Sequence, residues 1–255
     1  MDPAVLGYGL FAFAFIEVPG GALEAGHSLG RRHDTAFVVA VGGSASLIVE
    51  FRCRDWQHLV VTLDDVRRDP SFAHAKIAIL QSYHKHDWSS LHSGGVVALA
   101  EDERPAYTVD AIDMDILKVL AEDGRATYAD IARRVAVSQG TARMRMTHLE
   151  EAGAVTVQTV ISPGILGLSG YAAVGLDVDG STKAVAEKVA QLVPVALVAS
   201  VFGAFDVIVE VGYRDPAHLV ETLDSLRSIP GVKRLESFSY LIEVKESMEA
   251  GLWGP

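Results

Sequence analysis

Two short runs of helical periodicity lie in the middle of the chain, at residues 127–152. In both runs apolar residues recur every three or four positions, which is the spacing of one buried helix face. Thr127 and Ser138 precede the two runs and are typical N-cap residues. Only Ala136 and Val137 remain for the turn between the runs, so the pattern predicts a helix-turn-helix. The expected buried stripe of its second helix is Ala142, Met146 and Leu149.

The outer face of the predicted second helix is polar and basic. Off its buried stripe lie Gln139, Gly140, Thr141, Arg143, Arg145 and His148. Between Thr127 and Leu149 four arginines stand against one acid, although the formal charge of the chain is −11: Arg133, Arg134, Arg143 and Arg145 against Asp130.

Such a helix would lie in the major groove, with its first turns facing base edges and the flanking cations on phosphates. We therefore expect Ser138 and the six polar positions of the second helix to contact double-stranded DNA. The simpler interpretation is a helical hairpin with a solvated basic face. Gly140 either lets the backbone approach DNA closely or is merely tolerated, at a cost of about 1 kcal/mol relative to alanine.

The chain contains an internal repeat on both sides of this helical region. Residues 3–70 align with residues 163–230 without a gap, at an offset of 160. For example, Ile48-Val49-Glu50 aligns with Ile208-Val209-Glu210, and His58-Leu59-Val60 with His218-Leu219-Val220. Each copy shows the order strand, helix, strand, strand, helix, strand. This order predicts an antiparallel four-stranded sheet with two helices on one face.

The expected segments of the first copy are Leu10–Val18, Gly21–Arg32, Ala36–Val41, Leu47–Phe51, Asp55–Arg68 and Ala75–Tyr83. Those of the second copy are Tyr171–Val178, Thr182–Leu192, Val195–Phe202, Val207–Val211, a helix capped by Asp215, and Lys233–Val244. The open face of each sheet needs cover, and we expect the two sheets to cover each other.

The predicted fold class is α+β, with two ferredoxin-like βαββαβ domains flanking a winged helix-turn-helix domain. We place a degenerate effector or dimerisation domain at 1–88 and a linker at 89–109. The helix-turn-helix domain follows at 110–161, and a second effector or dimerisation domain at 162–247.

Composition narrows the function classes. A content of 49% hydrophobic residues in 255 supports real cores, and the acidity argues against wholesale coating of nucleic acid. The single cysteine, Cys53, excludes an intrachain disulfide, and we expect a packed thiol in a reducing compartment. The apolar run Leu10–Val18 is too short to span a bilayer, and no export signal precedes it. We expect a cytoplasmic protein without a membrane partner.

No constellation for catalysis, metal binding or a cofactor is visible in the sequence. His74, His84, His86 and His92 cluster only loosely, whereas a metal site needs three or four convergent ligands. Glu50 and Glu210 occupy matching strand ends, where we expect them to be solvated rather than catalytic. The protein is therefore not expected to be an enzyme.

The order of motifs resembles that of the Lrp/AsnC (feast/famine) family of transcriptional regulators. The helical part of the resemblance is carried by Ile112-Asp113, Glu122-Asp123-Gly124-Arg125, Ile131-Ala132, Val135, Val137-Ser138, Arg145 and Leu149-Glu150-Glu151-Ala152-Gly153. The sheet part is carried by Pro163, Leu166-Gly167, Gly203-Ala204-Phe205-Asp206 and Pro230-Gly231-Val232. The resemblance covers about residues 110–246, and by the repeat also 3–88. It implies a regulator whose sheet domains form homo-oligomers and bind a small effector, commonly an amino acid.

The family's effector loop, glycine-x-aromatic-aspartate, matches Gly203, Phe205 and Asp206. The resemblance implies that these residues bind the effector, since a loop carboxylate can pair with an ammonium group. The alternative is that Asp206 caps the loop and Phe205 packs in an interface. The first copy has Gly43-Ser44-Ala45-Ser46 instead, and we expect it to be a structural half-site. The chain looks like two fused family protomers without the first helix-turn-helix.

Two other functions remain open at this point. Some proteins that resemble this family are tetrapyrrole (sirohaem) decarboxylases, although the intact effector loop and the basic helix speak against that activity. The chain could also be an assembly module with a vestigial helix-turn-helix.

Overall fold

Two sets of six elements flank three helices in the computed structural model, which describes residues 8–86, 108–152, 154–155 and 167–246. The first set is β1 (Leu10–Glu17), α1 (Ala22–Gly30), β2 (Thr35–Gly42), β3 (Leu47–Cys53), α2 (Trp56–Arg68) and β4 (His74–His86). The second is β5 (Gly170–Val178), α7 (Thr182–Ala190), β6 (Val195–Gly203), β7 (Val207–Tyr213), α8 (Pro216–Arg227) and β8 (Val232–Glu246). The helices between them are α4 (Ala111–Glu122), α5 (Tyr128–Val135) and α6 (Gln139–Glu151).

The predicted order of elements is confirmed in both copies, and the corresponding strands begin at the predicted offset of 160 residues. Strands β1 and β5 begin at residues 10 and 170, and β3 and β7 at 47 and 207. Most of the predicted linker 89–109 and residues 156–161, the end of the predicted helix-turn-helix domain, lie outside the described residues.

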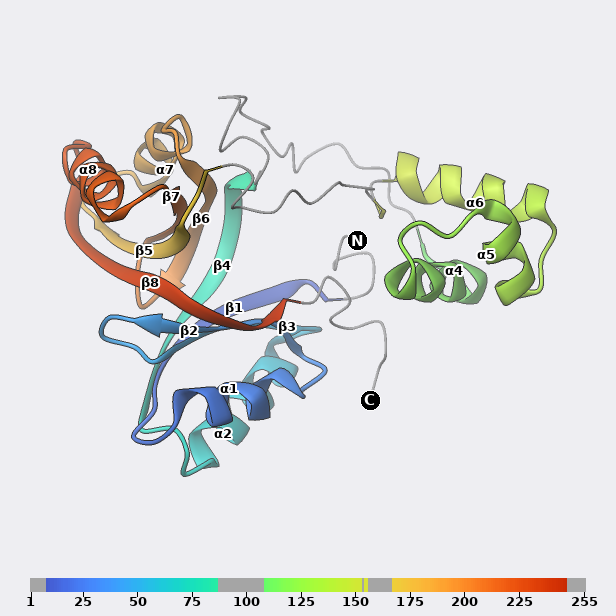
Figure 1. Cartoon of the computed structure of the whole chain (residues 1–255), viewed down its shortest axis with the longest axis horizontal. Helices are drawn as coiled ribbons and strands as arrows, with labels where there is room; N and C mark the ends of the chain where they lie inside the picture. The colour runs from blue at the N-terminus through green and yellow to red at the C-terminus, as the bar shows by residue number, and fades with distance from the viewer. Residues whose placement is uncertain (1–7, 87–107, 153, 156–166, 247–255) are drawn as a thin grey trace.

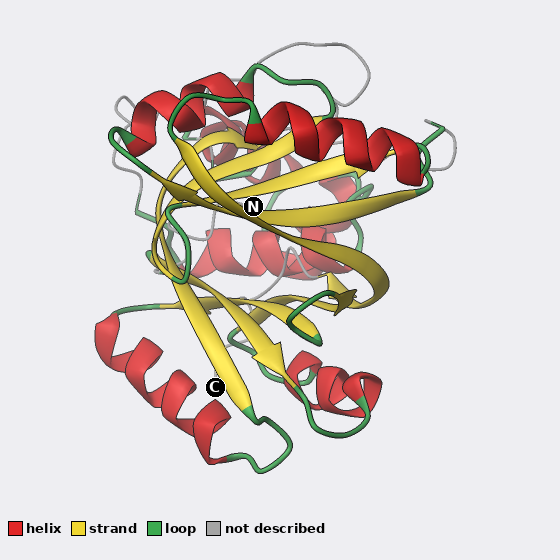
Figure 2. Cartoon of the chain, turned by 90° about the vertical axis from the view of Figure 1, so that its left-hand side faces the viewer, coloured by secondary structure: helices red, strands yellow, loops and turns green. Residues whose placement is uncertain are grey.

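The eight strands close into one barrel, in the order β1-β3-β2-β8-β5-β7-β6-β4 (Figures 1 and 2). The prediction that the open faces of the two copies cover each other is confirmed, because residues of both copies fill one interior, but the two sheets are joined into one closed sheet. The two copies join edge to edge, through β2 with β8 and β4 with β6, and all of these pairs are antiparallel. Their open faces meet inside the barrel.

The length of the last strand of each copy causes this closure. The first part of β4, from His74 to Ile79, pairs with β1 of its own copy, and the part from Ala78 to His86 pairs with β6 of the other. Strand β8 does the same with β5 and then β2, changing partner at Ser239. Each long strand thus serves as an edge of its own sheet and as a bridge to the other.

The barrel interior is one hydrophobic core to which both copies contribute. Large residues of one copy correspond to small residues of the other at an offset of 160. The three clearest pairs are Phe15 with Gly175, Ala45 with Phe205, and Ala78 with Phe238. The rings of Phe15, Phe205 and Phe238 lie within 4.9–6.2 Å of one another between centroids. The two copies therefore fill one interior by complementary sizes rather than by repeating the same packing.

The four helices of the two copies cover the outside of the barrel (Figure 2). A second core lies between α1, α2 and their strands and includes Phe51 and Leu59, and a third includes Val209 and Leu226 beneath α7 and α8. Because the strands are buried on both faces, they read as nearly continuous apolar runs. None of the helices in the described residues is long and apolar enough to cross a membrane.

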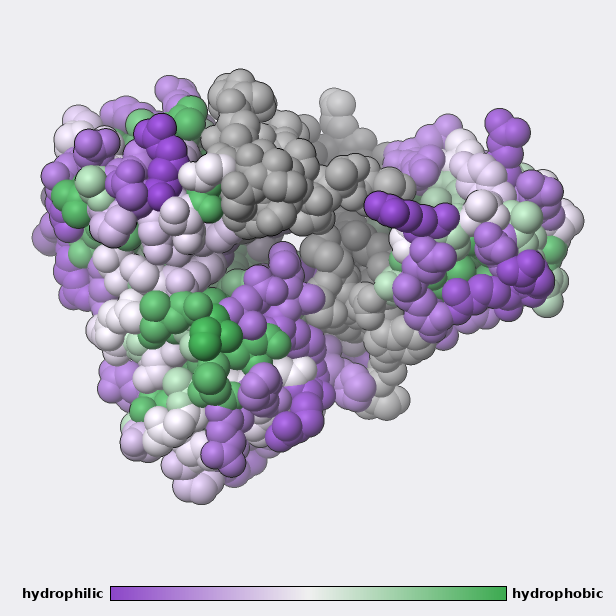
Figure 3. Space-filling model, viewed as in Figure 1, coloured by the Kyte–Doolittle hydropathy of each residue, from purple (hydrophilic) through white to green (hydrophobic). Residues whose placement is uncertain are grey.

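The outer surfaces of the two seams between the copies differ. Leu241 and Ile242 of β8 are exposed on the side of β2, and Leu23 is exposed on α1, which packs beside them. Figure 3 shows apolar side chains gathering over this part of the surface. At the other seam the exposed apolar residue is Phe202, whose counterpart in the first copy is Gly42. The two copies thus have the same order of strands and helices but expose different apolar side chains at the two seams.

Candidate DNA-binding and ligand-binding sites

Two capped helices and a tight turn build the helix-turn-helix as the sequence predicts. The Thr127 hydroxyl accepts the N–H of Asp130 at 3.2 Å, and Asp130 in return accepts the N–H of Thr127 at 3.3 Å. Ala136 ends α5 in the left-handed region, with φ 59°. The Ser138 hydroxyl then accepts the N–H of Thr141 at 3.0 Å and starts α6. These caps satisfy donors that a helix start leaves free.

The core beneath these helices fixes which face of α6 points outward. Ala142, Met146 and Leu149 are buried against Ile116 and Leu117 of α4, as predicted for the stripe of the second helix. Two exposed rows run along the other side of α6, each with a spacing of four residues. They are Gln139, Arg143 and Thr147, and Gly140, Met144 and His148. Met144 and Thr147 were not singled out in the sequence, because neither is charged and Met144 resembles a core residue.

Arg145 does not belong to the outward face, and the expectation that it would point outward is wrong. Its Nη1 lies 2.7 Å from Asp110 Oδ2 and 3.3 Å from both carboxylate oxygens of Asp113. The Arg145 side chain is 26% exposed, whereas that of Asp113 is fully buried. Arg145 thus holds α6 against the start of α4. The signal that could have shown this is the Asp110-x-x-Asp113 spacing of a capping box.

The basic excess of this region is smaller than the sequence count indicates. Arg133 pairs with Asp130 at 2.6 Å, Arg134 pairs with Glu122, and Arg145 pairs with the two aspartates of α4. Of the four arginines counted in the sequence, only Arg143 forms no ion pair with the described residues. The free positive charge of the outward face is therefore concentrated at the second turn of α6.

The three predicted effector residues lie where β6 meets β7: Gly203 ends β6, and Phe205 and Asp206 belong to the loop that follows. Gly203 has φ +124°, and a Cβ atom there would lie 2.3 Å from the carbonyl oxygen of Ile77. The next residue, Ala204, donates its N–H to that same oxygen at 2.8 Å. The glycine is therefore required by the close approach of β4 from the other copy.

Phe205 and Asp206 make internal contacts, as the structural alternative predicted. Phe205 is 3% exposed inside the barrel, where its ring meets that of Phe15 edge-on at 5.1 Å. Asp206 Oδ2 accepts the N–H of Val178 at 2.7 Å and so caps the loop. In the first copy the Ser46 hydroxyl accepts the N–H of Val18 at 3.2 Å in the same way. Ser46 thus replaces the cap of Asp206 but not its charge.

A polar cluster lies inside the barrel beside the apolar core. Glu210 is 8% exposed, and its Oε1 accepts the hydroxyl of Tyr240 at 2.6 Å. Burial raises the pKa of Glu210 to about 7, against the lowering effect of Tyr240. Glu50, its counterpart in the repeat, accepts a hydrogen bond from Nε of Arg52 at 2.9 Å. The expectation that both acids would be solvated at strand ends is wrong, because they lie in the middle of β3 and β7 and are largely buried in the closed barrel.

Cys53 is fully buried, which confirms the prediction of a packed thiol. Burial raises its pKa to about 11, so the reactive thiolate form is scarce at neutral pH. Of the four histidines that cluster loosely in the sequence, His84 places its Nε2 2.8 Å from the Ser200 hydroxyl, and His92 lies outside the described residues.

Comparison with known proteins agrees with this architecture. The model of the AsnC-type helix-turn-helix domain matches residues 109–150, and that of the Lrp/AsnC ligand binding domain matches residues 171–250. An uncharacterised HTH-type transcriptional regulator of Pyrococcus horikoshii, PH0140, is 33% identical over 141 residues, which cover 54% of this chain and 89% of that protein. One from Pyrococcus furiosus, PF1231, is 34% identical over 141 residues and is covered to 95%.

Solved structures show the same relationship. The transcriptional regulator NMB0573 of Neisseria meningitidis, in complex with L-methionine, is 28% identical with a TM-score of 0.51 and covers 55% of this chain and 95% of its own. Escherichia coli AsnC shares the fold, with a TM-score of 0.50 at 24% identity, and covers 53% of this chain and 94% of its own. From these two matched domains and these relatives, the chain belongs to the Lrp/AsnC family of helix-turn-helix transcriptional regulators.

Proposed function

We propose that this regulator reads DNA with the two exposed rows of α6 and that Arg143 supplies the main phosphate contact. The proposal is based on the different surroundings of two arginines of α6. Arg145 forms ion pairs with Asp110 and Asp113, whereas Arg143 is exposed and unpaired among the described residues. Gln139 and Thr141 lie on the first turn, from which a recognition helix reaches base edges. Ser138 caps that turn, Gly140 lies within it, and His148 lies further along the exposed row of Gly140 and Met144. Met144 offers an apolar contact for a thymine methyl group.

The proposal is tested by fluorescence anisotropy with an operator selected from random duplexes. Arg143→Ala should weaken binding to all sequences and reduce the salt dependence of the affinity, as expected for a phosphate contact. Gln139→Ala or Thr141→Ala should instead change the preference between sequences. Arg133→Ala is the matched control, because Arg133 is also exposed but pairs with Asp130 on α5. Equal loss with Arg133→Ala and Arg143→Ala would reject the assignment.

One chain carries one such helix between residues 108 and 155 and both halves of the barrel. A single helix-turn-helix binds weakly, so we propose that two chains combine on two half-sites about one helical turn apart. Light scattering of the protein with a two-site duplex and with a one-site duplex separates the cases. Two chains on the first and one on the second are expected.

We further propose that the effector is an amino acid. The structure of the Neisseria meningitidis regulator with L-methionine supports this choice of ligand class. A thermal-shift screen over the amino acids tests it, because a ligand that binds the native state raises the melting temperature by mass action. If the loop of Gly203, Phe205 and Asp206 contacts the effector, Asp206→Ala should abolish the shift.

A further inference from the structure

One cleft of the first copy has no polar counterpart in the second. Its volume is about 610 Å³, within the usual range for small-molecule sites, and its lining includes Tyr8, Arg32, Asp34, Arg54, Asp55 and His58. At an offset of 160 the second copy keeps Arg214, Asp215 and His218 but has Leu168, Leu192 and Pro194 at the other three positions. The first copy therefore has a tyrosine and a charged pair where the second copy has three apolar residues.

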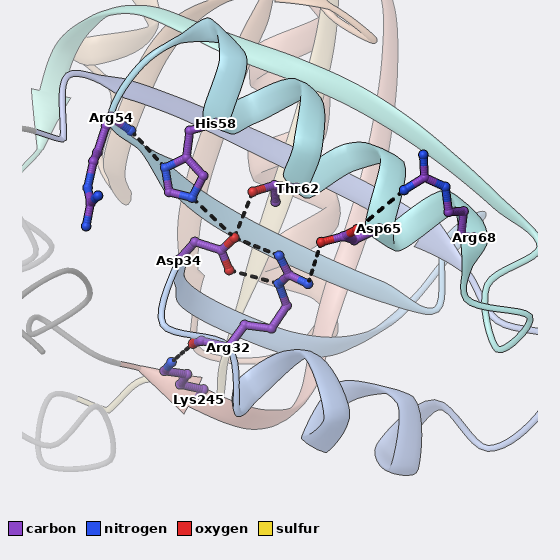
Figure 4. Close-up of polar contacts among 8 residues, drawn as sticks. All are labelled: Arg32, Asp34, Arg54, His58, Thr62, Asp65, Arg68 and Lys245. Atoms are coloured by element: carbon purple, nitrogen blue, oxygen red, sulfur yellow. Dashed lines mark hydrogen bonds and ion pairs between the residues drawn. The ribbon is translucent and has the colours of Figure 1, made fainter. Parts of the chain in front are cut away.

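The charged pair of Arg32 and Asp34 lines this cleft as its floor, and Figure 4 shows the contacts that the pair makes. The Asp34 carboxylate accepts two hydrogen bonds from the Arg32 guanidinium, both at 2.8 Å, and one from the Thr62 hydroxyl at 2.7 Å. Nε2 of His58 lies 3.8 Å from the same carboxylate. Burial alone would raise the pKa of Asp34, but the hydrogen bonds from Arg32 and Thr62 outweigh it and hold the pKa below its usual value. The floor is thus ionised, paired and rigid.

Arg54 is the charged group of the cleft that remains available. Its backbone N–H is anchored to Nδ1 of His58 at 3.2 Å, while its guanidinium lies 5.5 Å from the centre of the Tyr8 ring. Its one polar side-chain contact among the described residues is a long one, 3.5 Å, to the Tyr8 hydroxyl, and it forms no ion pair there. Figure 4 shows its side chain pointing away from the Asp34 pair. An arginine held beside a ring with open donors suits a planar anion.

We propose that this cleft binds a small molecule with a carboxylate group, which Arg54 holds above the ring of Tyr8. Such a site is separate from the loop of Gly203 and from the DNA-reading face of α6. The exposed Asp55, whose Oδ1 accepts the N–H of His58, adds a negative charge to the lining that favours a ligand with an additional ammonium group. The first copy is then a binding module of its own rather than a purely structural half.

Isothermal titration of the full chain with each L-amino acid and with its 2-oxo acid tests the proposal. At least one of these carboxylates should bind, and Arg54→Ala should raise its Kd at least about tenfold, because charge-assisted hydrogen bonds contribute about 1.5–3 kcal/mol. Tyr8→Leu, which introduces the residue of the second copy, should weaken binding less. Tighter binding of amino acids than of 2-oxo acids would assign the ammonium to Asp55.

Arg214→Ala is the matched control, because Arg214 has the same backbone anchor to a histidine, at 3.2 Å, but Leu168 in place of the ring. It should leave Kd unchanged. The proposal is overturned if no probe binds, if Arg54→Ala and Arg214→Ala weaken binding equally, or if Asp206→Ala abolishes binding while Arg54→Ala does not. A melting curve without ligand shows whether Arg54→Ala is folded, and DNA affinity, measured separately, reports on the proposed function alone.

Discussion

Arg143 and Arg145 are two positions apart on α6 and have opposite surroundings. Arg143 lies in an exposed row, whereas Arg145 reaches back to two carboxylates at the start of α4. A hydrogen bond from the Asp113 backbone lowers the pKa of Asp110, and Arg145 adds to this effect. Charge alone could not separate the two arginines in the sequence, since the partners of Arg145 lie 32 and 35 residues away.

We predict that Arg145→Ala destabilises the helix-turn-helix by about 3 kcal/mol, because it removes the ion pair between Arg145 and the buried carboxylate of Asp113. Urea unfolding followed by circular dichroism measures this change. Arg143→Ala should alter the free energy of unfolding by less than about 0.5 kcal/mol, as expected for an exposed residue, while it weakens DNA binding. The opposite result, an Arg145→Ala protein that is as stable as the wild type but binds DNA weakly, would show that Arg145 contacts DNA.

Glu210 predicts a pH dependence of stability at the residue scale. Its pKa of about 7 in the folded barrel exceeds the ordinary value of 4.5, so the folded state binds the proton more tightly than the unfolded state. This contribution is complete below pH 4.5 and is lost as pH rises through 7. It amounts to about 3 kcal/mol. Glu210→Gln should be more stable than the wild type at pH 8 by about this amount, and similar to it at pH 4.5. Parallel curves for both proteins from pH 4.5 to 8 would exclude this role.

At the scale of elements, local signals were sufficient for helices and strands but not for their assembly. Thr127, Ser138 and Asp215 are the caps that their side chains and positions predict. The closure of the barrel depends on residue pairs that are far apart in the sequence, such as Ala78 with Gly203. It also depends on β4 and β8, which extend beyond the strands of their own copy. No periodicity within β4 or β8 records which strand its second part will meet.

The loop at Gly203 gives a prediction about one such long-range contact. Gly203→Ala should destabilise the barrel by more than about 2 kcal/mol, because the new methyl group would overlap the Ile77 carbonyl oxygen and the positive φ adds strain. Gly180→Ala is the control, since Gly180 has φ +91° but no heavy atom within 4 Å of the added carbon. It should cost only the strain, about 1–2 kcal/mol. Thermal unfolding compares the two, and equal losses would mean that β4 yields to the methyl group.

The whole molecule makes the two copies dependent on each other. Each copy supplies small residues where the other supplies rings, and each lends a strand to the other's edge. Two identical sheets could not fill this interior in the same way, because a second set of Phe15, Phe205 and Phe238 would have to replace Gly175, Ala45 and Ala78. The closed barrel also leaves no strand edge within the described residues for pairing with a second chain. Association of two chains on DNA must therefore use another surface.

This dependence predicts that damage to one copy loosens both. Leu59→Ala removes a buried side chain between α2 and the first sheet, and should lower the free energy of unfolding by about 2–5 kcal/mol. Since β2 pairs with β8 and β4 with β6, hydrogen exchange should speed up in β5 to β8 as much as in β1 to β4. Leu226→Ala in the second copy should produce the same pattern in reverse. Faster exchange confined to the mutated copy would show two independent sheets in contact rather than one cooperative barrel.

In a single cooperative barrel, a ligand in the cleft of the first copy would also stabilise the strands around Gly203.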